Sequence, residues 1–446
     1  MTKGTLLRKA ALEILLSYEK DEVIPELISD RIFDKYGLAD RRDRAFITLL
    51  SEGTIERKIT LDHVISRFSS VKLPKIKPVI KNILRLGIYQ ILFMDSVPES
   101  AAVNESVKLA VLSGLKPLSG FVNGVLREIA RKGFDISLCT DPSVKYSMPE
   151  WIASLLTEEF GRERAERIMA SFLDKRPVFI RTNISLITRE ELKARLNKDG
   201  VAVKDLPDND IALEIRDFGD LREVEAFKEG LFSVQDLSSM EAGLEISRIL
   251  LREEKKSFFI KDLCGAPGGK ACHSAEILGS YCKERDISGK EENALFNVLT
   301  GDISEKKTER IRENIERLRL DNIAVRVFDA RKEEGGGEKA DLIIADLPCS
   351  GLGVMGRKND IKYRRKKEDI PALRELQREI LRASLPGLKP GGYLIFSVCT
   401  IDKEETKEQR DWIERSLGLG FIKDRLFIPG EDPGDGFYYA LFIKND

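Results

Sequence analysis

The amino-acid sequence predicts a multidomain protein with an all-α N-terminal domain, a small α+β middle domain and a C-terminal α/β domain with a Rossmann-like, mostly parallel sheet. The 446 residues exceed what a single hydrophobic core usually holds. Apolar residues recur three and four positions apart as far as residue 131, which indicates helices. Beyond residue 231, short apolar runs alternate with helical stretches, which indicates a parallel sheet. We expect domains at residues 1–140, 141–230 and 231–446.

The N-terminal domain shows helical spacing throughout, and Asp and Pro residues separate its segments as caps or breaks. The predicted helical segments are Leu6–Tyr18, Ala45–Ile59, Val79–Phe93 and Ala101–Leu112. The middle domain mixes short helices with strands. Its clearest predicted strand is Val178–Thr182.

Charge is distributed unevenly along the chain. The formal net charge is −1, yet residues 1–140 contain 22 Lys and Arg against 17 Asp and Glu. Between residues 57 and 85, eight basic residues are opposed only by Asp62. Such a stretch suits the phosphates of a nucleic acid, and a solvated helix face explains it equally well. The eight residues are Arg57, Lys58, Arg67, Lys72, Lys75, Lys77, Lys81 and Arg85.

The C-terminal domain contains a regular series of apolar runs that we interpret as buried parallel strands. They are Phe258–Leu263, Phe296–Gly301, Ala324–Phe328, Leu342–Ala345 and Tyr393–Phe396. A final run, Gly436–Ile443, is expected to form an antiparallel edge strand. Open sheets of this type bind ligands at the carboxyl ends of their strands, so that edge is where we look for chemistry.

Composition excludes several classes of protein. No apolar run approaches the roughly 20 residues of a membrane helix, and we expect a cytoplasmic protein without membrane contact. The six cysteines contain no CxxC pair, and the chain has only two histidines. A zinc cluster of Cys264, Cys272, His273 and Cys282 is disfavoured because Cys264 belongs to a glycine-rich turn, so no metal is expected.

The glycine-rich turn follows the first predicted strand of the C-terminal domain. It comprises Cys264, Gly265, Ala266, Pro267, Gly268, Gly269 and Lys270. Glycines let backbone amides approach a ligand closely, and the following helix adds positive potential. The spacing matches neither GxGxxG nor a phosphate loop, which favours a ligand without phosphates. Asp302 ends the second strand, where a carboxylate suits ribose hydroxyls, and Asp329 ends the third, near a purine edge. Together these features indicate S-adenosyl-L-methionine.

Two cysteines follow neighbouring predicted strands, and both are expected at one pocket. Methylating C5 of a cytosine requires a thiolate that adds to C6, because C5 alone is a poor nucleophile. Cys349 and Cys399 are the candidates, and residue patterns alone do not order them. Asp346 is placed to stabilise charge near N3, and Lys270 is the candidate cation that would favour the thiolate.

Several of these motifs resemble those of known protein families. The sequence from Asp262 to Lys270, from Asp346 to Gly353, from Asp360 to Tyr363 and from Val398 to Thr400 resembles the motif set of RNA cytosine-5 methyltransferases. Segments including Asp40–Phe46, Leu84–Ile91, Pro98–Glu105 and Gly120–Arg127 resemble the NusB-like RNA-binding helical domain. The combination is similar to the RsmB/Sun (Fmu) family of 16S rRNA methyltransferases.

The resemblance implies a class I methyltransferase that modifies C5 of one cytosine of 16S rRNA, nucleotide 967, through a covalent adduct. It implies that Cys399 is the nucleophile and that Cys349 helps to release the product. It also places Asp302, Asp329, Asp346 and the turn around the cofactor. We expect the partner to be 16S rRNA and the protein to be a monomer.

Two other functions remain in view. Methylation of an exocyclic base nitrogen needs no thiol and usually pairs Asp or Asn with Pro-Pro-aromatic, a clamp that Leu347-Pro348-Cys349 lacks. An RNA-binding assembly factor with an inactive catalytic fold is the second alternative. The complete set of acids and thiols argues against it.

Overall fold

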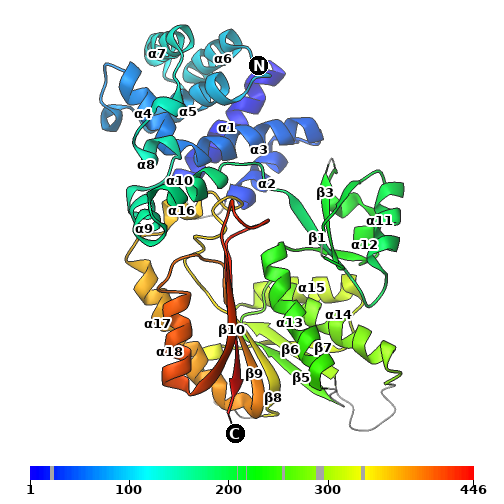
Figure 1. Ribbon diagram of the computed structural model, residues 1–446. Helices are drawn as coiled ribbons and strands as arrows, with labels where there is room; N and C mark the ends of the chain where they lie inside the picture. Colours follow the sequence, from blue (N-terminus) through cyan, green and yellow to red (C-terminus); the bar gives the residue numbers. More distant parts are fainter. Residues whose placement is uncertain are drawn as a thin grey trace. The chain divides into compact units, whose positions relative to one another are not determined.

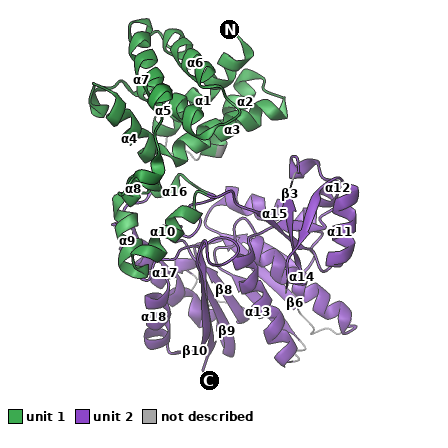
Figure 2. Cartoon of the chain, turned by 45° about the horizontal axis from the view of Figure 1, so that its top comes forward, with its two compact units in different colours: residues 1–173, 358–364 green, residues 174–357, 365–446 purple. Residues whose placement is uncertain are grey.

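The computed structural model describes residues 1–20, 25–207, 209–216, 218–253, 257–287, 296–332 and 337–445. The chain divides into two compact units, which Figure 2 shows in different colours. The first contains residues 1–173 and 358–364, and the second contains residues 174–357 and 365–446. The fold class predicted from the sequence is confirmed. The domain boundaries after residues 140 and 230 stay predictions.

The first unit is helical, as its periodicity predicted. Its helices are α1 (Lys3–Lys20), α2 (Pro25–Tyr36), α3 (Arg41–Glu56), α4 (Lys58–Phe68), α5 (Pro78–Phe93), α6 (Glu99–Leu112), α7 (Ser119–Lys132), α8 (Pro142–Lys145), α9 (Glu150–Phe160) and α10 (Arg162–Ser171). Asp40 caps α3 by accepting from the N–H of Arg42, and Pro78 occupies the first turn of α5. Helix α5 is buried along most of its length and is the centre of the core.

A short segment from much later in the sequence completes this unit. Residues 358–364 include α16 (Ile361–Arg364). Lys362 Nζ donates to the carbonyl of Glu56 at 2.9 Å, and the hydroxyl of Tyr363 donates to the same carbonyl at 3.0 Å. The sequence placed Asp360 to Tyr363 with the methyltransferase motifs, but the structure packs this segment against helices of the first unit.

The second unit begins with a small antiparallel sheet in the order β2-β3-β1-β4. Its strands are β1 (Val178–Thr182), β2 (Ala202–Asp205), β3 (Ala212–Arg216) and β4 (Phe232–Val234). Helices α11 (Arg189–Lys198) and α12 (Glu225–Lys228) pack on it around a buried cluster that includes Ile180, Leu196 and Phe232. The predicted strand Val178–Thr182 is confirmed at both ends.

The large sheet has seven strands in the order β10-β11-β9-β8-β5-β6-β7. Five are parallel: β5 (Phe258–Asp262), β6 (Phe296–Asp302), β7 (Ile323–Val327), β8 (Ala340–Asp346) and β9 (Leu388–Val398). Strands β10 (Leu419–Phe427) and β11 (Phe437–Lys444) are antiparallel. The sequence predicts an antiparallel edge strand over Gly436–Ile443. The strand found there, β11, is antiparallel, but the prediction that it lies at the edge is wrong, because β10 pairs with its outer side.

Alternating side chains of the large sheet enter two separate cores. Leu342 and Ile344 of β8 join the cluster formed with α13 (Leu237–Glu253) and α14 (Gly269–Glu284). Ile343 and Ala345 join the cluster formed with α17 (Asp369–Ser384) and α18 (Lys407–Leu417). Figure 1 shows these helix pairs on opposite faces of the sheet. A strand buried on both faces reads as a continuous apolar run, which is why β8 was predictable.

Within the described ranges, no helix is both long enough and apolar enough to cross a bilayer.

Candidate active site

The predicted residues Asp302, Asp346 and Cys399 lie at the carboxyl ends of parallel strands, and Asp262 lies at the end of the strand among them. Asp302, Asp262 and Asp346 are the last residues of β6, β5 and β8, and Cys399 directly follows β9. Strand β5 is where the chain order reverses, because β6 and β7 extend to one side and β8 and β9 to the other. Such a switch point is the usual ligand-binding position in an open α/β sheet.

The glycine-rich turn lies between β5 and α14 and leaves no room for side chains at its start. A Cβ on Gly265 would lie 1.9 Å from Thr300 Oγ1 and 2.8 Å from Asp262 Oδ2. Gly268 has φ +106°, a conformation that favours glycine. The turn is held by the N–H of Gly265, which donates to the carbonyl of Gly301 at 2.8 Å. The turn therefore packs closely against the ends of β5 and β6 before α14 begins.

The carboxylates around this turn differ in environment. Burial, followed by the nearby charge of Asp346, raises the pKa of Asp262 to about 7. Among the described residues, Asp262 Oδ1 has no hydrogen-bond partner, while Oδ2 accepts from Thr300 at 3.2 Å. Asp302 is buried and accepts from the N–H of Ser304 at 3.2 Å. Among the described residues, no donor therefore reaches Oδ1 of Asp262 beside the turn. The hydrogen bond from Ser304 holds Asp302 at the end of the neighbouring strand β6.

Asp329 lies two residues beyond β7, the edge strand. The hydrogen bond from Arg331 holds the pKa of Asp329 at about 2. The two side chains form an ion pair at 2.7 Å. Contact of Asp329 with a purine stays a prediction.

Lys270 and Asp346 form an ion pair across the site. Lys270 Nζ donates to Asp346 Oδ2 at 2.6 Å, and Ser397 Oγ donates to Asp346 Oδ1 at 2.9 Å. The Lys270 side chain is only 8% exposed and also lies 4.9 Å from the ring centroid of Phe437. Both oxygens of Asp346 are therefore engaged, which fixes its orientation between the cofactor turn and β9.

The two predicted cysteines meet. Cys349 Sγ and Cys399 Sγ lie 3.2 Å apart, and neither cysteine is in a disulfide. Cys349 is buried, whereas Cys399 is partly accessible. The hydrogen bond to Cys399, together with burial, raises the pKa of Cys349 well above its usual range. Either sulfur can be the donor in this contact, and the raised pKa of Cys349 favours the protonated form of its thiol.

Three interactions missed in the sequence hold the two thiols in place. Ser350 Oγ and Thr400 Oγ1, each the residue after a cysteine, are hydrogen-bonded at 2.8 Å. The N–H of Gly353 donates to the carbonyl of Cys399 at 3.1 Å. The carboxylate of Glu405 accepts from the N–H of Ser350 at 3.0 and 3.2 Å. The hydroxyl residues after both cysteines were a visible signal, whereas nothing local marked Glu405.

The residues present fit the predicted cofactor. A turn without room for side chains, the unpartnered Asp262 Oδ1 and the acid at the end of β6 form a site for a polar ligand with hydroxyl and amino groups. The fold and this site define a class I methyltransferase. When bound, S-adenosyl-L-methionine supplies the methyl group.

Comparison with known proteins identifies the family. Residues 248–418 match the family described as 16S rRNA methyltransferase RsmB/F, residues 5–131 match the NusB family, and residues 148–222 match the ferredoxin-like domain of RsmF/B-like methyltransferases. The chain is 34% identical to the "Probable ribosomal RNA small subunit methyltransferase B" of Bacillus subtilis, over 91% of this chain and 87% of the relative. It is 32% identical to ribosomal RNA small subunit methyltransferase B of Vibrio cholerae, over 90% of each.

The chain belongs to the ribosomal RNA small subunit methyltransferase B family. It is an S-adenosyl-L-methionine-dependent methyltransferase whose substrate is ribosomal RNA. Among solved structures, that of PH0851 shares the fold over 100% of both chains, with a TM-score of 0.78 and 22% identity. NSun6 from Pyrococcus horikoshii, solved with SFG, covers 67% of this chain and 98% of its own, with a TM-score of 0.58 and 23% identity.

Proposed function

We propose that this protein methylates C5 of a specific cytosine of 16S rRNA, nucleotide 967, through a covalent adduct between Cys399 and C6. The observation that carries the proposal is the 3.2 Å contact between Cys349 Sγ and Cys399 Sγ, just beyond the ends of the neighbouring strands β8 and β9. Transfer to an exocyclic nitrogen would require neither thiol. We further propose that the protein acts as a monomer in the cytoplasm.

Cys399 is the better nucleophile of the two because it is partly accessible, while Cys349 is buried and keeps its proton. The Cys399 thiolate adds to C6, and the displaced electron pair makes C5 nucleophilic. S-adenosyl-L-methionine, which the glycine-rich turn, Asp262 and Asp302 would hold, would supply the methyl group to C5 at this stage. Asp346, held by Lys270 and Ser397, stabilises the pyrimidine as the adduct forms.

Release requires the opposite change. A base removes the C5 proton, the C–H electron pair re-forms the C5–C6 double bond, and the bond from C6 to Cys399 breaks. The S–H of Cys349 donates to the departing sulfur and makes it a better leaving group. The raised pKa of Cys349 and its contact with Cys399 support this role.

The proposal is tested with purified protein, radiolabelled S-adenosyl-L-methionine and 16S rRNA, both naked and in small subunits. Mass spectrometry of nucleosides should show 5-methylcytidine, and bisulfite mapping should locate it. N4-methylcytidine would overturn the C5 assignment. Binding of cofactor and RNA without any transfer would instead favour the assembly-factor alternative.

Cysteine variants test the division of roles. Cys399→Ser should abolish transfer, and Cys349→Ala should accumulate an RNA–protein adduct that resists denaturant. Cys282→Ala, on α14, is the matched control and should behave as wild type. Full activity of Cys399→Ser would refute its role as nucleophile. Normal turnover by Cys349→Ala without adduct would refute the release role.

A further inference from the structure

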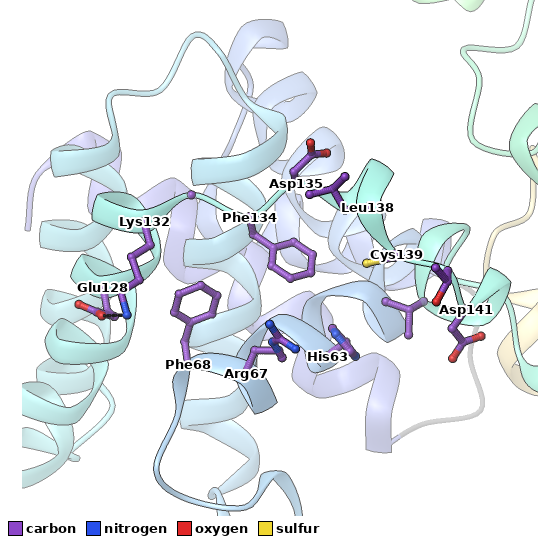
Figure 3. Close-up of a pocket in the computed structure, with 13 residues that line it drawn as sticks. His63, Arg67, Phe68, Glu128, Lys132, Phe134, Asp135, Leu138, Cys139 and Asp141 are labelled. Carbon is purple, nitrogen blue, oxygen red and sulfur yellow. Dashed lines mark ion pairs between the residues drawn. The ribbon is translucent and has the colours of Figure 1, made fainter.

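The helical unit contains a cavity of about 710 Å³ that the methyltransferase chemistry does not use. Its walls come from the end of α4, the end of α7 and the segment from Gly133 to Val144 (Figure 3). This volume is within the range of pockets that bind small organic groups. The cavity is formed entirely by residues of the first unit.

Aromatic rings line this cavity. Phe68, the last residue of α4, and Phe134, two residues after α7, both contribute to its wall and are only partly buried. The ring of His63 lies 6.0 Å from that of Phe134 at an angle of 56° (Figure 3). Partly exposed aromatic rings around a cavity are the surfaces on which unpaired nucleobases stack.

Both basic and acidic side chains line the cavity: Arg67 and Lys132 against Glu128, Asp135 and Asp141. Arg67 is exposed, and within the described part of the chain no hydrogen bond or ion pair engages its guanidinium. The acids of the wall are occupied: Glu128 pairs with Lys132 at 2.7 Å, and Asp135 and Asp141 each accept a backbone N–H at a helix start. Arg67 is therefore a cation available for a phosphate.

The basic stretch noted in the sequence separates into buried and exposed residues. Arg85 is buried and pairs with Asp62 and Glu19, each at 2.6 Å, so it serves the core. Lys72, Lys75 and Lys77 are exposed on the segment that follows Phe68. The exposed cations that could contact a phosphate are therefore Arg67 at the cavity and the three lysines that follow it in the sequence.

We propose that this cavity binds one unstacked nucleobase of single-stranded RNA between Phe68 and Phe134, with Arg67 on the adjacent phosphate. The inference rests on the proposed action on ribosomal RNA and adds a second contact outside the methyltransferase domain. Single-stranded RNA is favoured over duplex because a duplex keeps its bases paired and presents no free ring to the aromatic wall.

The test measures binding by the full-length protein of a fluorescein-labelled single-stranded RNA of about 12 nucleotides and of the corresponding duplex. The double variant Phe68→Leu, Phe134→Leu keeps apolar volume and removes the aromatic faces. It should weaken single-strand binding about tenfold and leave duplex binding unchanged. Phe121→Leu, on α7 and packed on the same core, is the control and should bind normally. Equal affinity of the double variant and Phe121→Leu for single strands would overturn the proposal.

Two further measurements do not depend on the aromatic variants. Arg67→Gln should lower the salt dependence of single-strand binding by about one released counterion, whereas Arg42→Gln, on α3, should not. A 4-thiouridine in the RNA should crosslink to peptides that contain residues 63–68 or 132–141. Crosslinks confined to other peptides would contradict the proposal. Because these are binding measurements, their outcome is independent of whether Cys399 proves to be the nucleophile.

Discussion

The carboxylate of Glu405 holds the backbone N–H of Ser350, with distances of 3.0 and 3.2 Å to its two oxygens. Gln377 Nε2 donates to the same carboxylate at 3.0 Å and to the carbonyl of Pro348 at 2.9 Å. These bonds fix the peptide on both sides of Cys349. Glu405 is therefore a positioning residue for the thiol pair, although it follows β9 and Cys349 follows β8.

Removing this anchor should impair catalysis more than RNA binding. Glu405→Ala should lower kcat for methyl transfer about 10- to 100-fold with little change in KM, because a displaced thiol loses its reactive geometry. Glu405→Gln keeps an acceptor for Ser350 and should restore most of the rate. Glu404→Ala is the neighbouring control, since Glu404 pairs with Arg374 instead. If Glu405→Ala raised KM and left kcat unchanged, Glu405 would not be a positioning residue.

The same residue gives the stability of the protein a pH dependence. Burial raises the pKa of Glu405 to about 7, from 4.5 when exposed. The folded state therefore holds this proton to higher pH than the unfolded state, and its contribution to stability falls as pH rises from about 4.5 to 7. The difference corresponds to about 3 kcal/mol. In urea unfolding, Glu405→Gln should gain stability relative to wild type over this pH interval. A difference that is constant between pH 4.5 and 8 would contradict this prediction.

The ion pair between Lys270 and Asp346 should show strong energetic coupling. Lys270 is 8% exposed and Asp346 34%, so Asp346→Ala, which strands the more buried charge, should destabilise more than Lys270→Ala. The loss of unfolding free energy in the double variant should be smaller than the sum of the losses in the two single variants, by about 0.5–3 kcal/mol. Urea unfolding of all four proteins measures this coupling. Lys270→Ala combined with Arg42→Ala is the control, and its two losses of unfolding free energy should add. If the losses of Lys270→Ala and Asp346→Ala also add, the two residues are not coupled.

Two glycines of the cofactor turn should respond differently to alanine. A Cβ on Gly265 would overlap Thr300 Oγ1, whereas one on Gly269 meets nothing nearer than 3.8 Å. Gly265→Ala should therefore cost about 1–3 kcal/mol in unfolding free energy. Gly269→Ala should fold normally and lose affinity for S-adenosyl-L-methionine, if backbone there approaches the cofactor as predicted. Calorimetric titration measures that affinity, and unchanged binding by Gly269→Ala would remove this residue from the cofactor site.

The strands that carry the site were predictable because burial on both faces leaves a clear signal. Leu342–Ala345 and Tyr393–Phe396 are continuous apolar runs, and they lie within β8 and β9. Their shared edge brought the two cysteines together as expected. Strand β10 was missed because its centre, Lys423-Asp424-Arg425, is charged, as suits a strand at the edge of a sheet. Because β10 was not predicted, β11 was the outermost strand of the predicted sheet and was therefore placed at its edge.

The remaining features depend on contacts between residues far apart in the sequence. Glu405 reaches Ser350 across 55 residues, and Lys362 reaches Glu56 across 306. No local periodicity or motif encodes either partner. The division of labour between Cys349 and Cys399 likewise came from family resemblance, and the structure adds a physical asymmetry, since only Cys349 is buried.

The segment from 358 to 364 should contribute measurably to the stability of the helical unit through Tyr363. Its hydroxyl lies 3.0 Å from the carbonyl of Glu56 and 3.1 Å from Ser147 Oγ. Tyr363→Phe keeps the ring and removes these bonds, which should lower the free energy of unfolding by about 1 kcal/mol. Tyr18→Phe, on α1, is the matched control, because no hydrogen bond engages the Tyr18 hydroxyl within the described residues. Urea unfolding followed by circular dichroism distinguishes them. If both variants unfold at the same urea concentration as wild type, the Tyr363 hydroxyl does not stabilise this unit.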